Sequence, residues 1–201
     1  HDLDNADMEL DVAEFKLPVK DLYRFIRIGS PDFQPIAQLD ALRKLDMKLK
    51  AKGKLKDFKA STKISTTPGT ISFDGKGSIR NMFANMQFDG VVKTDNFHVA
   101  QVIGDGVGGD NLYLNTRAGV KLLRDKPMEI SADGVIGSVL YNNYNYKDLQ
   151  IAGSYIGGDI EGHVVSNTDD NKFDLMADMN FSGRMKIDVQ GVVDKLYLSP
   201  L

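Results

Sequence analysis

The chain of 201 residues contains no cysteine, which excludes disulfide bonds, cysteine nucleophiles and thiolate metal sites. It also has no excess of positive charge. Because 25 Lys+Arg stand against 28 Asp+Glu, the composition indicates no general attraction to nucleic acid or to an anionic membrane. No apolar run has the length of a membrane span, and no charged-then-apolar leader opens the chain. Strand patterns extend to both ends, so we expect a piece of a longer, repetitive protein.

What the chain has in abundance is a period-two alternation of apolar and polar residues. In MKLKAKGKLKDFKAS, residues 47–61, Met47, Leu49 and Leu55 alternate with lysines. Successive side chains of a strand point to opposite faces, so this stretch predicts a strand with one apolar and one lysine-rich face. We expect the lysines to form a solvated face that discourages edge-to-edge pairing, in preference to a phosphate site. They are Lys44, Lys48, Lys50, Lys52, Lys54, Lys56 and Lys59.

The same alternation recurs along the whole chain and predicts an all-β protein of about ten or eleven strands joined by short turns. The predicted strands are 8–12, 47–55, 58–64, 71–77, 86–92, 112–122, 128–132, 149–155, 160–164, 173–181 and 185–191. We treat residues 1–201 as a single β-rich segment with a short helical insertion at about 20–45. There, Ile36, Leu39, Leu42 and Leu45 recur at three-residue spacing and predict an amphipathic helix over the end of the sheet.

Glycine recurs on the apolar parity of these strands. Glycine weakens a strand and leaves nothing to fill a core, so it usually marks a bend or a close approach of two backbones. Its repetition predicts a strongly curved, elongated sheet whose concave side is apolar and narrow. The alternative is a pair of sheets that approach each other closely. The glycines concerned are Gly53, Gly75, Gly77, Gly90, Gly153, Gly162 and Gly191.

Motifs with possible chemistry are few. GDGVGG, residues 104–109, has G-x-G-x-x-G spacing, but a strand pattern follows it where a phosphate site needs a helix, and one copy does not make a calcium-binding β-roll. Asp169 and Asp170 precede Asn171 in a typical turn sequence. His98 and His163 have no second ligand at a metal-site spacing. With no nucleophile motif either, we expect no enzyme, no metal and no cofactor.

Three longer stretches carry a resemblance to a known family. Residues 144–183 read YNYKDLQIAGSYIGGDIEGHVVSNTDDNKFDLMADMNFSG. They combine a Tyr-x-Tyr-Lys start, a strand ending in Gly153, then Tyr155, the paired Gly157 and Gly158, Gly162 and an Asp-Asn turn. FQPIAQLDALRKLDMKLKAKGKLKDFKASTKISTTPGTISFDGKGSI, residues 33–79, combines a short helix with strands and a glycine-punctuated pair. With residues 88–120, the pattern covers most of the chain. It resembles the repeating segments of the TamB branch of the AsmA-like proteins, the translocation and assembly module family, in versions from Bacteroides-like bacteria.

This resemblance implies a non-enzymatic segment of a periplasmic bridge whose full-length chain is anchored in the inner membrane. It implies a taco-like sheet with an apolar groove for phospholipid transport to, or assembly of, the outer membrane. The implied partners are phospholipid acyl chains, neighbouring segments of the same chain and an outer-membrane assembly-factor barrel, although no barrel-binding region is recognisable here. We expect the groove to be lined by Leu49, Ile71, Phe73, Phe88, Leu114, Ile151, Phe173 and Leu175.

Two other functions are compatible with the sequence. The first is a secreted β-sandwich binding or adhesion module, in which Tyr141, Tyr144 and Tyr146 of YNNYNY contact a glycan or a protein. Alternating tyrosines are also good strand formers, so this motif is not specific. The second is a β-helical carbohydrate enzyme, for which the sequence provides no carboxylate constellation. An opposing sheet packed against the apolar residues would contradict the groove.

Overall fold

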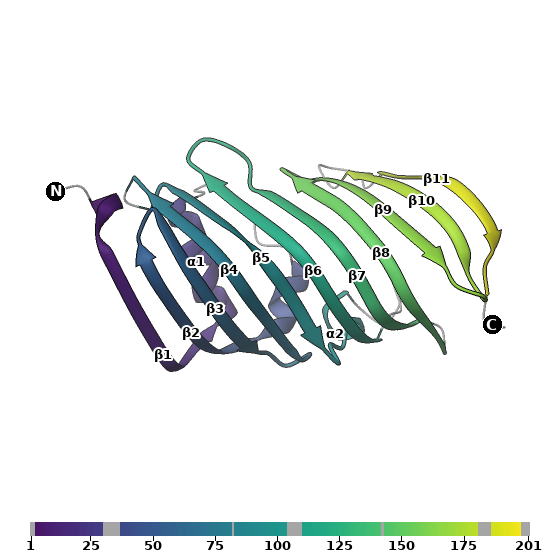
Figure 1. Cartoon of the computed structure of the whole chain (residues 1–201), viewed down its shortest axis with the longest axis horizontal. Coiled ribbons are helices and arrows are strands. Elements are labelled where there is room, and N and C mark those ends of the chain that lie inside the picture. The colour runs from purple at the N-terminus through teal and green to yellow at the C-terminus, as the bar shows by residue number, and fades with distance from the viewer. Residues whose placement is uncertain are drawn as a thin grey trace.

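The computed structural model consists of one sheet of eleven antiparallel strands that follow each other in chain order. It describes residues 3–29, 37–81, 83–103, 110–141, 143–180 and 186–197. The sheet is curved and does not close on itself (Figure 1). The strands are β1 (Asp7–Pro18), β2 (Lys44–Lys54), β3 (Asp57–Ser65), β4 (Thr70–Arg80), β5 (Asn85–Asp95), β6 (Asp110–Leu123), β7 (Glu129–Tyr141), β8 (Tyr144–Ile156), β9 (Asp159–Asn167), β10 (Lys172–Asn180) and β11 (Lys186–Lys195). The predicted all-β class and strand number are confirmed, and no second sheet is present among the described residues.

The pairing register gives the sheet two chemically different faces. Leu49, Phe88 and Leu175 lie on one face, which we call the apolar face. Lys48 and Lys50 lie on the other, which we call the polar face, and both side chains are exposed. The alternation in β2 therefore predicted its two faces correctly. Along the strands the pleat maintains this separation, because side chains two residues apart share a face.

Short helices cover part of the apolar face. They are the 3₁₀ helices η1 (Leu3–Asn5) and η2 (Ala37–Leu42), and the α-helices α1 (Val19–Gly29) and α2 (Ala100–Ile103). Val19 and Tyr23 lie one turn apart on α1 and are buried, with Met128 packed against them. Since Met128 leads into the apolar parity of β7, α1 covers the apolar face. Figure 1 shows α1 and α2 behind the N-terminal half of the sheet only.

The main cluster on the apolar face is aromatic. Phe58 is buried with the small residues Ala51 and Ala60, and Phe73 and Phe88 pack against them. The rings of Phe58 and Phe88 meet edge to face, with centroids 6.3 Å apart and planes inclined by 74°. This cluster spans β2–β5 and is the core of the N-terminal half of the sheet.

The predicted N-terminal helix differs from the observed one in extent. Ile36, the first residue of its pattern, lies outside the described residues, and η2 ends at Leu42 instead of Leu45. Arg43 has a φ of 55°, a left-handed conformation that a right-handed helix does not continue through. Leu45 then pairs with Leu17 in the β1–β2 ladder. The predicted insertion thus holds two elements, α1 and η2, and the apolar stretch before GDGVGG forms the unpredicted α2.

The glycine-rich motif GDGVGG at 104–109 lies outside the described residues. The chain enters β6 directly after it, at Asp110, so the prediction that a strand follows this motif is confirmed. A short turn joins the predicted strands 58–64 and 71–77, as expected: the amide of Thr66 donates to the carbonyl of Gly69 at 2.8 Å.

Candidate functional site

One register row on the apolar face consists of small residues. Every strand from β2 to β10 contributes an alanine or a glycine, while β1 and β11 contribute larger apolar residues at the two ends. In strand order the row is Leu10, Ala51, Ala60, Gly75, Gly90, Ala118, Ala132, Gly153, Gly162, Ala177 and Val189. Adjacent strands lie about 4.8 Å apart, so this small-residue row crosses the sheet from edge to edge over about 48 Å.

Bulkier apolar side chains flank the small-residue row on the C-terminal strands. On one side of it lie Ile130, Tyr155, Ile160, Met179 and Ile187. On the other side lie Ile151, Val164 and Leu175, and the glycines Gly134 and Gly191 end this second wall. Rows two residues away on each side are separated by about 13 Å along the strands. The arrangement is a shallow track with a low floor and apolar walls.

In the N-terminal half, phenyl rings cover this floor. A Cβ atom added to Gly75 would lie 2.7 Å from Cζ of Phe73, and one added to Gly90 would lie 2.7 Å from Cε2 of the same ring. The ring therefore lies across both glycines. Together with the burial of Ala51 and Ala60, this makes the row part of a closed core on β2–β5.

In the C-terminal half the floor is open. A Cβ added to Gly162 would meet only the carbonyl oxygen of Ala177, at 3.8 Å, among the described residues. One added to Gly153 would have backbone atoms of Glu161 and Gly162 as its nearest neighbours. Towards the edge, Ile187 and Val189 of β11 are 55% and 56% exposed. From β7 to β11 the track therefore faces solvent.

All eight residues that the sequence predicted as groove lining are on the apolar face, but they lie in two different settings. Leu49, Ile71, Phe73, Phe88 and Leu114 belong to the strands that the helices and the aromatic cluster partly cover. The uncovered strands carry Ile151, Phe173 and Leu175. All are half-buried except Phe173, which is buried. The alanines of the small-residue row were not predicted as part of the site, because an alanine within a strand pattern does not by itself indicate a functional position.

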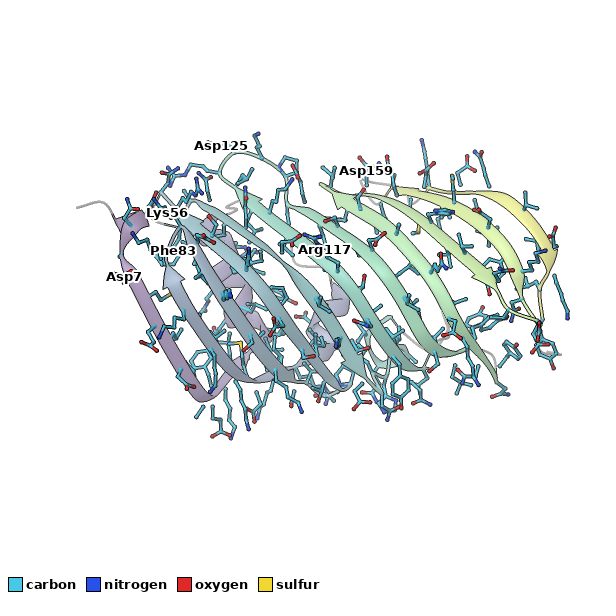
Figure 2. All side chains as sticks on the ribbon, viewed as in Figure 1. Asp7, Lys56, Phe83, Arg117, Asp125 and Asp159 are labelled. Atoms are coloured by element: carbon cyan, nitrogen blue, oxygen red, sulfur yellow. The ribbon has the colours of Figure 1, made fainter. Side chains whose placement is uncertain are left out.

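A hollow of about 930 Å³ lies on the opposite, polar face, over β1–β5. Lys48, Lys50, Lys63 and Lys93 line it, together with serine, threonine and aspartate side chains. Of the predicted lining residues, only Leu49 and Phe73 border this hollow, and most of its other lining residues belong to the polar face. On the apolar face, the N-terminal half is filled by the helices and the aromatic cluster, in contrast to the continuous narrow concave side that the glycines suggested. Figure 2 shows how densely side chains project from the sheet, with Arg117 near its middle.

The tyrosines of YNNYNY contact one another and the end of the chain. Tyr144 stacks on Tyr197, with ring centroids 4.4 Å apart, and meets Tyr146 edge to face at 4.7 Å. The hydroxyl of Tyr146 donates to the carbonyl of Tyr197 at 2.9 Å. Burial, with the neighbouring Tyr144 and Tyr141, raises the pKa of Tyr146. These contacts give the motif a structural role, so no observation here favours a glycan-binding surface.

The histidines each lie beside a single carboxylate. His163 Nε2 is 2.7 Å from an oxygen of Asp174, and His98 Nδ1 is 2.8 Å from an oxygen of Asp110. In the described part of the chain, no group of three or more histidine or carboxylate side chains lies close enough to hold a metal ion.

Comparisons with protein-family models, with curated proteins and with solved structures find no match for this chain. None of the helices in the described ranges is long and apolar enough to cross a membrane. What the protein does must therefore be inferred from the geometry and chemistry of the two faces of its sheet.

Proposed function

We propose that the apolar face carries the acyl chains of phospholipids along the small-residue row. In this proposal the chain is a non-enzymatic segment of a periplasmic bridge of the TamB type, which moves lipid towards the outer membrane. The observation that supports it is the open track from β7 to β11, where a Cβ added to Gly162 would meet a single described atom within 4 Å, the carbonyl oxygen of Ala177. An unfilled apolar track on a single sheet suits a hydrocarbon ligand better than it suits protein packing.

The free energy of removing an acyl chain from water is compatible with a carrier surface of this kind. Each buried methylene gains about 0.8 kcal/mol, so a sixteen-carbon chain exposed to water is disfavoured by roughly 12 kcal/mol. A carrier between two membranes needs only to remove this penalty, and it gains nothing from holding the chain more tightly than a bilayer does. Side chains such as Ile151, Val164 and Leu175 offer non-directional contacts with no polar anchor. A chain lying on them meets low barriers to sliding.

The small-residue row reaches both edges of the sheet, although only its C-terminal part, from β7 to β11, is open. At the C-terminal edge, Ile187 and Val189 are more than half exposed, and at the N-terminal edge Leu10 is 40% exposed. An additional strand at either edge would prolong the row without placing a polar side chain in it. This continuity is what a segment of a longer conduit requires.

The test is mass spectrometry of organic extracts from the purified protein, together with aspartate variants of the two faces. Leu175→Asp and Ile151→Asp place a charge in the walls of the track. Met176→Asp and Val135→Asp introduce the same charge at exposed apolar positions on the polar face and serve as matched controls. Circular dichroism and thermal melting establish that all four variants fold.

We expect phospholipid to copurify with the parent and with both controls, and to fall at least fivefold per protein in Leu175→Asp and Ile151→Asp. Phospholipid at parental levels in both wall variants would contradict the proposal. A well-folded parent without bound lipid, even after incubation with phospholipid vesicles, would contradict it as well.

A further inference from the structure

On the polar face of β2–β4, lysines lie directly opposite one another. Lys48 pairs with Lys63 across β2 and β3. Four residues further along β2, Lys52 pairs with Lys59 of β3, which in turn pairs with Lys76 of β4. Like charges directly opposite in an antiparallel pair are destabilising. Sheet stability therefore gives no reason for this arrangement, whereas an anion shared between the ammonium groups does.

Only part of this charge is neutralised within the protein. Lys50 forms an ion pair with Asp11 at 3.2 Å, and Lys52 forms one with Glu9 at 3.0 Å. The other lysines on the polar face of β2–β5 form no ion pair with any described residue. They are Lys44, Lys48, Lys54, Lys59, Lys63, Lys76 and Lys93.

Three of these lysines border the hollow of about 930 Å³ on this face. Lys48, Lys63 and Lys93 belong to one register row, with Ser72 between the last two. From β2 to β5 this row is about 14 Å long. Ser61 and Ser72 also line the hollow, and the hydroxyl of Ser72 donates to the backbone carbonyl of Lys93 at 3.5 Å. Asp11, which is paired with Lys50, and Asp74 are the two carboxylates in the lining.

The other end of the polar face has the opposite charge. Glu161, Asp178 and Asp188 lie directly opposite one another across β9, β10 and β11. The face is therefore polarised along the sheet, although the net charge of the chain is only -3. An anion approaching it is attracted to β2–β5 and repelled from β9–β11.

We propose that the hollow over β1–β5 binds phosphate groups, and that it takes at least two at once. Lysine ammonium groups are compact charges suited to phosphate, and their spacing along the row exceeds what one phosphate group spans. The phosphates can belong to a free polyphosphorylated compound or to the headgroups of anionic phospholipids. This site is on the opposite face from the lipid track and is independent of the proposed transport.

The first experiment is calorimetric titration of the whole chain at low salt with tripolyphosphate, and separately with orthophosphate. A Lys48→Gln/Lys63→Gln double variant removes one opposed pair. Lys147→Gln, which changes an exposed lysine of β8, is the matched control. We expect tripolyphosphate to bind more tightly than orthophosphate, and the double variant to bind it about tenfold more weakly or worse. Lys147→Gln should bind as the parent does.

Cosedimentation with phosphatidylglycerol vesicles, using phosphatidylcholine vesicles as the control, distinguishes the two sources of phosphate. Binding to the anionic vesicles alone, lost in the double variant, assigns the phosphate to lipid headgroups. Binding to tripolyphosphate alone, with the same loss, assigns it to a free compound. If neither probe binds, or if the double variant binds both as the parent does, the proposal is overturned.

Thermal melting provides a readout that a merely solvated lysine face would not change. Without ligand, Lys63→Gln removes a repulsion and should raise the melting temperature by up to about 3 °C. Tripolyphosphate should raise the melting temperature of the parent and should not raise the melting temperature of the double variant. A lower melting temperature for unliganded Lys63→Gln would show that Lys63 stabilises the sheet and would overturn the argument from opposed charges.

Discussion

The ring of Phe58 lies over Gly77, its direct partner across β3 and β4. A Cβ atom added to Gly77 would come within 2.3 Å of Cζ of that ring. Glycine on the apolar face thus has two uses in this sheet. On the N-terminal strands it makes room for a phenyl ring that lies flat on the backbone. On the C-terminal strands, at Gly153 and Gly162, it leaves the floor of the track uncovered.

Replacement of these glycines by alanine should therefore have opposite consequences in the two halves. Gly77→Ala forces the Phe58 ring out of its position, and we expect a loss of about 1–3 kcal/mol in the free energy of unfolding. Gly162→Ala is the matched control, because its methyl group enters open space and lowers the entropy of the unfolded chain. We expect it to be neutral or to stabilise by up to about 1 kcal/mol. Urea denaturation of both variants measures the difference, and equal effects would contradict this account of the glycines.

Filling the open floor should block the track without unfolding the sheet. Gly162→Phe places a ring where the structure has none, so the folded protein should retain its thermal stability to within a few degrees. If acyl chains lie on the small-residue row, copurified phospholipid should decrease severalfold. Ala152→Phe adds the same ring to the polar face and should leave the lipid content unchanged. Unchanged lipid content in a folded Gly162→Phe protein would count against the row as the path.

The buried hydroxyl of Tyr23 makes the free energy of unfolding depend on pH in the alkaline range. Burial, and to a lesser extent the hydrogen bond to Asp40 at 3.1 Å, raises the pKa of Tyr23 to about 12. An unfolded tyrosine titrates near 10, so the folded protein holds this proton more tightly. The resulting stabilisation is complete below pH 10 and is lost as the pH rises from 10 to 12.

Tyr23→Phe should remove the last step in the phenolate absorbance titration and flatten the dependence of stability on pH above 10. At neutral pH the variant should lose about 1 kcal/mol with the hydrogen bond. Tyr113→Phe, which removes an exposed tyrosine, is the control: it reduces the total absorbance change by one tyrosine but should keep the last titration step and the dependence of stability on pH above 10. A final titration step that persists in Tyr23→Phe would show that another group is responsible for it.

The strands and their faces were predictable because a period-two pattern is local and needs no knowledge of partners. The small-residue row was not, because it exists only once register is known. Gly75 and Gly90 are unusual residues within a strand pattern, whereas Ala118 and Ala132 are not, although all four occupy equivalent positions in the small-residue row. The hollow on the polar face depends on how the strands twist, and no residue pattern encodes that twist.

The helices show a different failure. Val19, Tyr23 and Ile26 recur at helical spacing in α1, yet the segment is short and follows a strand directly. The helix predicted within the insertion was therefore the pattern from Ile36 to Leu45, and α1 was not predicted as an element of its own. Which part of the sheet the helices would cover was equally inaccessible, because packing between distant segments decides it. Such tertiary packing separates the predicted lining residues into covered and open ones.

Asn171 connects the turn after β9 to the end of the chain. The turn predicted at Asp169 and Asp170 is confirmed, with the amide of Thr168 donating to the carbonyl of Asn171 at 2.8 Å. The side-chain amide of Asn171 donates to the hydroxyl of Tyr144 at 3.1 Å, and its oxygen accepts from the amide of Tyr197 at 3.0 Å. The residue is 2% exposed, so its loss leaves these partners unsatisfied in a buried site.

We expect Asn171→Ala to lower the free energy of unfolding by about 1–3 kcal/mol and to release the segment around Tyr197, because both side-chain hydrogen bonds disappear at once. Hydrogen exchange at Tyr197 should increase, while exchange in β2–β5 should not. Asn115→Ala, at an exposed asparagine of β6, should stay within about 0.5 kcal/mol of the parent. If Asn171→Ala matches Asn115→Ala in both measurements, the tyrosine cluster holds the end of the chain without this amide, and the stacking of Tyr144 on Tyr197 is the stronger attachment.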